Sequence, residues 1–387
     1  MKNNNILFCM GTRPEVIKMA PVYHAFAESG MNPLLLHTGQ HQDMAQAMYE
    51  FFNIVPNFTL NLIRESDRLC HLSSLILEKL GAIITEIRPS AVLVHGDTTS
   101  AVMAALAAFY QKIPVGHVEA GLRSHHNYDP FPEEKNREMI SRLAQWHFAP
   151  TEQAQKNLLS ENIRPANIHM VGNTIVDAVR MTTTVFNGRL ENDPEIHSGV
   201  LQALPLQLQS KRLVVVTTHR RENLGDPLLS ITKAIRKLLE KQSDLVIVWP
   251  VHVNPKVRQV VHAAFENMPT VISERIYLTQ PLNYSTMVWL LKKAWLVLTD
   301  SGGIQEESAC LQLPVLILRE TTERPELVQS GLGKLIGTDQ ETIVNNVQEL
   351  IKNNKIYLNM RNAHNPFGDG FSAQRICEII GREKIAA

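Results

Sequence analysis

Short apolar runs recur along the chain, and each ends in a polar or glycine-containing turn followed by a helical pattern. These runs lie at 5–10, 91–94, 115–118, 213–216, 245–249, 295–298 and 315–318. Strands that alternate with helices are typical of parallel sheets covered by helices on both faces. The length of 387 residues is enough for two such sheets, since a domain usually has about 100–200 residues. The pattern therefore predicts an α/β protein with two Rossmann-like halves.

The polar stretch 187–199 separates the two groups of strands, and we expect a domain border just before it, near 171–177. Pro14 suits the first turn of a helix after the first strand, where a backbone N–H is not needed. Pro21 is expected to kink or interrupt that helix. A final helix is predicted at 373–380.

Composition and charge exclude several classes of protein. Lys and Arg total 38, and Asp and Glu also total 38, so the chain has no excess charge for non-specific binding of nucleic acid or of a membrane surface. No apolar run approaches the roughly 20 residues that cross a bilayer. The 4 cysteines lie far apart without a Cys-x-x-Cys pair. We therefore expect thiols in a reducing cytoplasm rather than a zinc or redox site.

Ionisable and polar side chains gather just after the expected strands. Ligands of open α/β sheets bind at the carboxyl ends of the strands, so these positions are where a site is expected. Any single residue at such a position can equally be a helix cap or a solvated surface residue. Random placement would not often put so many ionisable residues at the ends of strands. The candidates are Arg13, Asp97, Glu119 and Glu133 in the first half and His219, His252, Ser301 and Arg324 in the second.

The segment 300–307, Asp-Ser-Gly-Gly-Ile-Gln-Glu-Glu, follows an apolar run and begins a helix. Gly302 and Gly303 let backbone N–H groups approach a ligand, and a helix N-terminus favours an anion. A diphosphate suits this position, and Glu307 can accept hydrogen bonds from a ribose. The alternative is an ordinary helix start with Ser301 as its N-cap. Neither a Gly-x-Gly-x-x-Gly motif after the first strand nor a Walker-type loop is present, so neither nicotinamide nor ATP is predicted.

Three carboxylates of the first half, on Asp97, Glu119 and Glu133, suggest proton transfer. Carboxylates gathered in a cleft raise one another's proton affinity, which can supply an acid and a base together. A metal site that uses His117 and Glu119 is the alternative. Residues two apart on a strand make a poor chelate and no His-Glu-x-x-His is present, so no metal is predicted. His219 can donate to a phosphate or act as an acid.

Several longer segments then point to a family. They are 11–15 (Gly-Thr-Arg-Pro-Glu), 95–99 (His-Gly-Asp-Thr-Thr), 116–123, 130–134 (Pro-Phe-Pro-Glu-Glu), 172–174, 219–223 (His-Arg-Arg-Glu-Asn), 299–307 and 321–326. In this order, and over nearly the full length, the chain resembles the non-hydrolysing UDP-N-acetylglucosamine 2-epimerases of bacteria. The first segment resembles the non-hydrolysing branch, since hydrolysing relatives typically show Gly-Ser/Thr-Arg-Ala-Glu-Tyr there.

The resemblance implies a GT-B fold, in which two Rossmann-like domains hold UDP in the cleft between them. The expected domains are residues 1–176 together with a returning C-terminal helix at about 368–387, and residues 177–367. The implied reaction interconverts UDP-GlcNAc and UDP-ManNAc by anti-elimination of UDP to a 2-acetamidoglucal and re-addition, without a cofactor. The family also suggests a homodimer that serves polysaccharide biosynthesis.

Matching motifs imply roles for individual residues. Met287 stands where the family often has an aromatic residue over the uracil, and Met can also cover a ring. A second, activating UDP-GlcNAc is implied near Gln40, His41 and Arg123, although residue 42 is Gln where many members have Arg. The implied catalytic residues are Asp97, Glu119, Glu133 and His219, and the implied substrate-binding residues are Arg13, Lys18, His252, Ser301, Gly302, Gly303, Glu307 and Arg324.

Other functions remain open at this point. A GT-B glycosyltransferase that uses a UDP-sugar shares the fold but does not need three carboxylates. A hydrolysing epimerase would release ManNAc and UDP, and a close relative would act on another 2-acetamido UDP-sugar. A nucleotide-sugar sensor would be expected to lack the carboxylates, which are present here.

Overall fold

The computed structural model describes residues 4–40, 42–62, 68–198, 201 and 211–386. The chain divides into two compact units: unit 1 comprises Met1–Met181 and Phe367–Ala387, and unit 2 comprises Thr182–Pro366. The first border lies inside helix α7 (Thr174–Thr184), a few residues beyond the expected border at 176/177. The second border, at 366/367, lies next to the expected one at 367/368.

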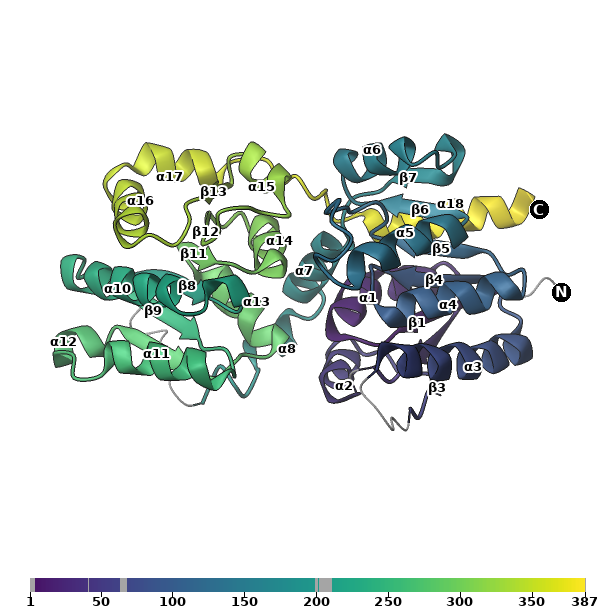
Figure 1. Ribbon diagram of the computed structural model, residues 1–387, viewed down its shortest axis with the longest axis horizontal. Helices are drawn as coiled ribbons and strands as arrows, with labels where there is room; N and C mark the ends of the chain where they lie inside the picture. The colour runs from purple at the N-terminus through teal and green to yellow at the C-terminus, as the bar shows by residue number, and fades with distance from the viewer. Residues whose placement is uncertain (1–3, 41, 63–67, 199–200, 202–210, 387) are drawn as a thin grey trace. The chain divides into compact units, whose positions relative to one another are not determined.

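Unit 1 contains a parallel sheet with the strand order β3-β2-β1-β4-β5-β6-β7 (Figure 1). The central strands β1, β4 and β5 are almost entirely buried, as expected for strands covered on both faces. The strands are β1 (Asn5–Met10), β2 (Asn32–His37), β3 (Phe58–Thr59), β4 (Ala91–His95), β5 (Val115–Val118), β6 (Trp146–Ala149) and β7 (Ile168–Met170).

Helices cover both faces of this sheet. Alternate residues of β1 point to opposite faces and pack against different helices. Leu7 and Cys9 join the core formed with α3 and α4, whereas the ring of Phe8 packs edge-on against Tyr23 and Phe26 of α1. Helix α18 packs beside α1. The helices are α1 (Arg13–Glu28), α2 (Gln42–Phe51), α3 (Leu69–Ile87), α4 (Thr99–Tyr110), α5 (Glu133–Leu143), α6 (Glu152–Ser160), the 3₁₀ helix η1 (Pro165–Asn167), α7 and α18 (Ser372–Ala386).

Unit 2 contains a second parallel sheet, with the order β10-β9-β8-β11-β12-β13. Its strands are β8 (Arg212–Thr217), β9 (Leu245–Pro250), β10 (Ile276–Thr279), β11 (Leu296–Thr299), β12 (Val315–Ile317) and β13 (Gly333–Leu335). Its helices are α8 (Asn187–Glu191), η3 (Arg221–Asn223), α10 (Asp226–Lys241), α11 (Pro255–Phe265), α12 (Thr270–Ser273), α13 (Tyr284–Lys293), α14 (Gly302–Cys310), α15 (Pro325–Gln329), α16 (Gln340–Lys352) and α17 (Asn354–Arg361).

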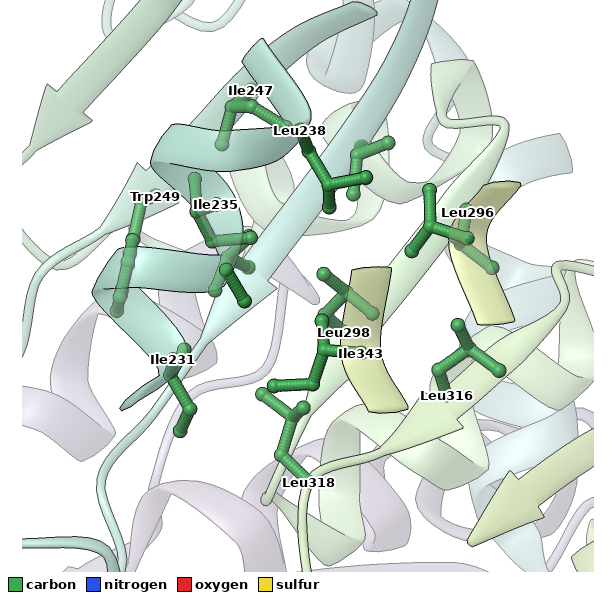
Figure 2. Packing of buried hydrophobic residues seen from close by; sticks show 14 of the residues in the cluster. Ile231, Ile235, Leu238, Ile247, Trp249, Leu296, Leu298, Leu316, Leu318 and Ile343 are labelled. Carbon is green, nitrogen blue, oxygen red and sulfur yellow. The ribbon is translucent and has the colours of Figure 1, made fainter. Parts of the chain in front are cut away.

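One face of the unit 2 sheet is covered by a continuous apolar core. Helix α10 contributes Ile231, Ile235 and Leu238, whose spacing places them on one side of the helix. Figure 2 shows these side chains with others of the same core: Ile247, Trp249, Leu296, Leu298, Leu316, Leu318 and Ile343. The core fixes the strands whose carboxyl ends carry the candidate site.

The two parallel sheets confirm the predicted α/β class, and all of the strands expected from the sequence are present. The interruption predicted at Pro21 is wrong, because α1 continues to Glu28. Pro21 and its neighbours are buried against the sheet. The stabilisation from this packing exceeds the cost of the backbone hydrogen bond that proline cannot make. None of the described helices is both long and apolar enough to span a bilayer.

Candidate active site

The carboxyl ends of the neighbouring strands β1, β4 and β5 carry the candidate residues of unit 1. Arg13 begins α1 shortly after β1, Asp97 follows β4, and Glu119 directly follows β5. Gly96, with φ of +67°, turns the chain between β4 and Asp97. Glu133 is the first residue of α5. Because these strands are parallel, their loops lie at the same edge of the sheet.

Glu119 lies beside two basic side chains. Lys18 donates to Oε2 of Glu119, and Nε2 of His95 lies 3.7 Å from the same oxygen. The backbone of Glu119 has φ of +65°, which side chains other than glycine rarely adopt and which is often found at functional sites. The Lys18 ammonium and the Glu119 carboxylate therefore lie together at the carboxyl end of β5.

Glu15 joins two of these loops from within the protein. It is 1 % exposed, and its Oε2 accepts hydrogen bonds from the backbone N–H groups of Gly11 (2.9 Å) and Thr12 (2.8 Å). Its Oε1 accepts from the hydroxyl of Thr98 in the loop after β4 (2.7 Å). Burial raises the pKa of Glu15 although these hydrogen bonds oppose the rise. This arrangement fixes the turn that carries Arg13.

Helix α5 holds Asp97 and gives two adjacent glutamates different surroundings. Arg137 donates to Oδ2 of Asp97 from Nε (2.8 Å) and Nη2 (2.6 Å). Burial favours the neutral form of Glu134, but hydrogen bonds from two backbone N–H groups and from Arg137 outweigh it and lower the pKa of Glu134. Within the described residues, the buried Oε2 of Glu133 has no hydrogen-bond partner. Glu134 is therefore held by its neighbours, whereas Oε2 of Glu133 is not held by any hydrogen bond within the described residues.

In unit 2, the paired strands β8 and β11 bring His219 to Asp300. Nδ1 of His219 lies 2.9 Å from Oδ1 of Asp300, whose carboxylate also accepts from the backbone of Arg220 and the side-chain amide of Asn223. Burial opposes the charge of Asp300, but His219 and these donors lower its pKa. An ionised Asp300 accepts a hydrogen bond from the protonated Nδ1 of His219, which leaves Nε2 of His219 for a ligand.

Helix α14 begins in surroundings that favour an anion. Ser301 is its N-cap and accepts from the backbone of Ile304 at 3.5 Å, so the capping interpretation describes Ser301 in this structure. A Cβ placed on Gly302 would lie 3.8 Å from Nη2 of Arg324 and 4.0 Å from Nη2 of Arg220. Two guanidinium groups therefore flank bare backbone at a helix N-terminus, an arrangement that can bind a diphosphate.

The other candidates of unit 2 follow the same edge of the sheet. His252 follows β9, and its Nδ1 accepts from the backbone N–H of Asn254 at 3.2 Å. Gly303 and Glu307 lie within α14, and Arg324 precedes α15. The four consecutive strands β9, β8, β11 and β12 thus all carry candidate residues. In the part of the chain that the structure describes, no group of three or more His, Cys, Asp or Glu is placed to hold a metal ion.

The three residues expected at an activator site have different surroundings. Gln40 accepts a hydrogen bond from the hydroxyl of Ser100 at 2.7 Å. The Arg123 side chain is 1 % exposed and donates to both carboxylate oxygens of Glu161 (2.6 and 2.9 Å), so its charge is balanced inside unit 1. His41 lies outside the described residues.

Sequence reasoning missed three residues that hold the site together. Glu15 stands three residues after Thr12, which is the spacing of a capping box. Arg137 stands four residues after Glu133 and therefore near the same helix face. Asp300 directly follows β11, the strand that leads into the Gly302 segment. Spacing signals were therefore present for the first two. The pairings of Arg137 with Asp97 and of Asp300 with His219, however, join residues 40 and 81 positions apart.

Comparisons with known proteins agree with this architecture. A family model described as UDP-N-acetylglucosamine 2-epimerase matches residues 24–381. The UDP-N-acetylglucosamine 2-epimerase of Escherichia coli K12 is 42 % identical over 382 residues, which cover 98 % of this chain and 99 % of the relative.

Solved structures are similar over the same extent. The UDP-GlcNAc 2-epimerase of Neisseria meningitidis bound to UDP-GlcNAc has a TM-score of 0.84 and 38 % identity, covering 98 % of this chain and 100 % of the other. The Methanocaldococcus jannaschii UDP-GlcNAc 2-epimerase in complex with UDP-GlcNAc and UDP has a TM-score of 0.76 and 32 % identity, covering 98 % and 99 %. The chain belongs to the UDP-N-acetylglucosamine 2-epimerase family.

Proposed function

We propose that this chain interconverts UDP-GlcNAc and UDP-ManNAc without hydrolysing them. The observation that carries the proposal is the set of carboxylates on Asp97, Glu119 and Glu133, placed around the strand ends of unit 1 in a member of this family. The relatives from N. meningitidis and M. jannaschii are bound to UDP-GlcNAc, which supports a UDP-sugar as the substrate.

The chemistry explains why several carboxylates are needed. Carbon 2 of the sugar has no neighbouring carbonyl, so its proton becomes removable only as UDP departs from carbon 1. A base takes the proton, the C2–H electrons form the C1=C2 bond of a 2-acetamidoglucal, and the C1–O electrons leave with UDP. UDP then returns to carbon 1 while a proton is delivered to the other face of carbon 2. Asp97, Glu119 and Glu133 exchange these protons from opposite faces.

The diphosphate needs its own groups, because its charge grows as UDP departs. His219, oriented by Asp300, donates to the departing or returning diphosphate, and the N-terminus of α14 stabilises the negative charge. Arg13 and Lys18 contact the diphosphate or glucal end. The residues proposed to bind UDP are Ser301, Gly302, Gly303, Glu307, Arg324 and His252.

Proton NMR of the purified protein with UDP-GlcNAc in D₂O, without added nicotinamide or metal, tests the proposal. We expect UDP-ManNAc to appear, with deuterium at carbon 2. Free ManNAc with UDP would assign the chain to hydrolysing chemistry. Unchanged UDP-GlcNAc would overturn UDP-GlcNAc as the substrate. The same experiment with other 2-acetamido UDP-sugars would then decide whether the chain epimerises another sugar, and turnover of none of them would overturn epimerisation.

Activation by a second UDP-GlcNAc is a separate part of the proposal. Gln40 is the best candidate for this site. The charge of Arg123, the cation expected there, is already paired with Glu161. A sigmoidal dependence of rate on UDP-GlcNAc that becomes hyperbolic in Gln40→Ala would support this site. A hyperbolic dependence in the unaltered protein would contradict it.

We further propose a cytoplasmic homodimer that supplies polysaccharide biosynthesis. The family resemblance supports the dimer and the pathway class. Cys9, Cys70, Cys310 and Cys377 form no disulfide among the described residues, which suits a reducing compartment. Light scattering during gel filtration tests the dimer directly.

A further inference from the structure

The side chain of Arg137 holds the carboxylate of Asp97 in place. Its guanidinium donates twice to the same oxygen, Oδ2, at 2.8 and 2.6 Å. Among the described residues, Oδ1 of Asp97 accepts no hydrogen bond. A carboxylate held through one oxygen keeps its orientation while its other oxygen remains able to exchange a proton.

We propose that Arg137 is a positioning residue for epimerisation, which fixes Asp97 through Oδ2 so that Oδ1 exchanges the proton at carbon 2. This inference rests on the proposed function, in which Asp97 is one of the proton-exchanging carboxylates. Arg137 acts through Asp97 and need not touch the reacting atoms itself.

Arg137 is suited to this role because it is itself held in place. Nη1 donates to Oε2 of Glu134 at 3.0 Å, and Glu134 accepts from the backbone N–H groups of Ser124 and His125 at 2.9 Å each. Burial disfavours the charge of Arg137, but the carboxylates of Asp97 and Glu134 outweigh it and raise its pKa. The guanidinium therefore stays charged and is fixed between two carboxylates.

The turn around Asp97 is held by contacts that do not involve Arg137. The side-chain amide of Asn136 donates to the Asp97 carbonyl at 2.8 Å, and Nε2 of His117 donates to the Gly96 carbonyl at 2.7 Å. Removing the guanidinium would thus release the Asp97 carboxylate while its backbone stays in place. The expected consequence is slower turnover of a folded enzyme.

Two other roles for Arg137 make different predictions. An ion pair that only stabilises unit 1 would lower the thermal midpoint and leave kcat of the folded enzyme unchanged. A guanidinium that binds the substrate directly would raise KM when it is removed. Of these three roles, only positioning lowers kcat at nearly constant KM.

The test compares Arg137→Met and Arg137→Lys with Arg142→Met. Arg142 lies on the same helix, is exposed, and donates to the carbonyl of Glu161, so its loss is a matched removal of charge. Each variant is assayed for kcat and KM with UDP-GlcNAc, for UDP affinity, and for its thermal midpoint. UDP affinity reports the nucleotide site of unit 2, which these substitutions do not touch.

We expect Arg137→Met to lower kcat by about 10- to 100-fold, since small misplacements of reacting groups have effects of this size. Its KM and UDP affinity should stay within about threefold. Arg137→Lys, which keeps the charge but not the two-point contact, should fall between it and the unaltered enzyme. Arg142→Met should keep kcat within about twofold.

The inference is overturned if Arg137→Met keeps the unaltered kcat, or if KM rises by as much as kcat falls. If Arg137→Met does not fold, the same two results for Arg137→Lys decide. An unaltered protein that turns over no 2-acetamido UDP-sugar would overturn the proposed function instead, so the two failures are distinguishable.

Discussion

At the residue scale, neighbouring carboxylates of this protein differ in chemical freedom because their partners differ. Glu134 accepts from two backbone N–H groups and from Arg137, whereas the buried Oε2 of the adjacent Glu133 has no hydrogen-bond partner within the described residues. The sequence shows two consecutive glutamates and cannot distinguish them, because the difference comes from a loop several residues away. The pairing of Lys18 with Glu119, 101 residues apart, likewise has no local signal.

Asp97→Asn is expected to abolish turnover and to leave UDP affinity nearly unchanged. The amide keeps the size of the side chain but cannot accept a proton as a carboxylate does. Epimer formation by NMR and UDP binding by calorimetry measure the two effects. Full activity of this variant would remove Asp97 from the catalytic set, and lost UDP binding would indicate a structural defect.

Asp300→Asn is expected to lower kcat by about 100-fold or more, because a correctly oriented general acid–base group contributes about 10²- to 10⁴-fold. The neutral amide accepts a weaker hydrogen bond from Nδ1–H of His219 than an ionised carboxylate does, so it no longer fixes the proton on Nδ1. A coupled assay for UDP-ManNAc measures the loss. Asp244→Asn, at an exposed pair with Arg212 at the opposite end of β8, is the control and should retain activity.

At the element scale, strands were predictable where apolar runs are long and uninterrupted, as in β1, β4, β8 and β9. The sequence pattern does not predict β2, β3, β6, β7, β10 and β13. Strand β3 has only 2 residues and β7 only 3, too few to show a period, and β2 begins Asn32-Pro33. Pairing with neighbouring strands defines these elements, and pairing is a long-range property.

Gly302→Ala should weaken UDP binding without unfolding unit 2. A Cβ at this position meets no atom closer than 3.8 Å, so the folded chain tolerates it. Its methyl group would occupy the space between two guanidinium groups where a phosphate is expected. We expect stability to change by less than about 1 kcal/mol while UDP affinity falls by about tenfold or more.

Gly81→Ala provides the control for this substitution. Gly81 also lies in a helix, and a Cβ there comes no closer than 3.9 Å to the Gln111 side chain. Both variants are compared by urea unfolding and by calorimetry with UDP. Equal UDP affinities in the two variants would contradict a diphosphate site at the start of α14.

At the scale of the whole molecule, acid should destabilise unit 1 through two buried histidines. Burial lowers the pKa of His117 to about 3 and that of His147 to about 4. An unfolded chain binds these protons near pH 6.5, so stability is full above that pH and is lost as the pH falls toward 4. Each histidine contributes up to about 1.4 kcal/mol per pH unit in this interval.

Urea unfolding at pH 7 and pH 5, followed by proteolysis and mass spectrometry, measures the loss separately for each unit. His147→Phe should reduce the pH dependence of unit 1, whereas His126→Gln, at an exposed position, should not. An unchanged pH dependence in His147→Phe would show that other groups control the acid response.

The chain enters unit 2 at Thr182 and leaves it at Pro366, so one unit is inserted within the other. During synthesis every residue of unit 2 is made before α18, the helix that packs beside α1. Domains generally fold as units while the chain emerges, with the N-terminal one first. Here that order is reversed: unit 1 is begun first but is closed last. A chain that stops before α18 therefore leaves the side of α1 that packs against α18 uncovered.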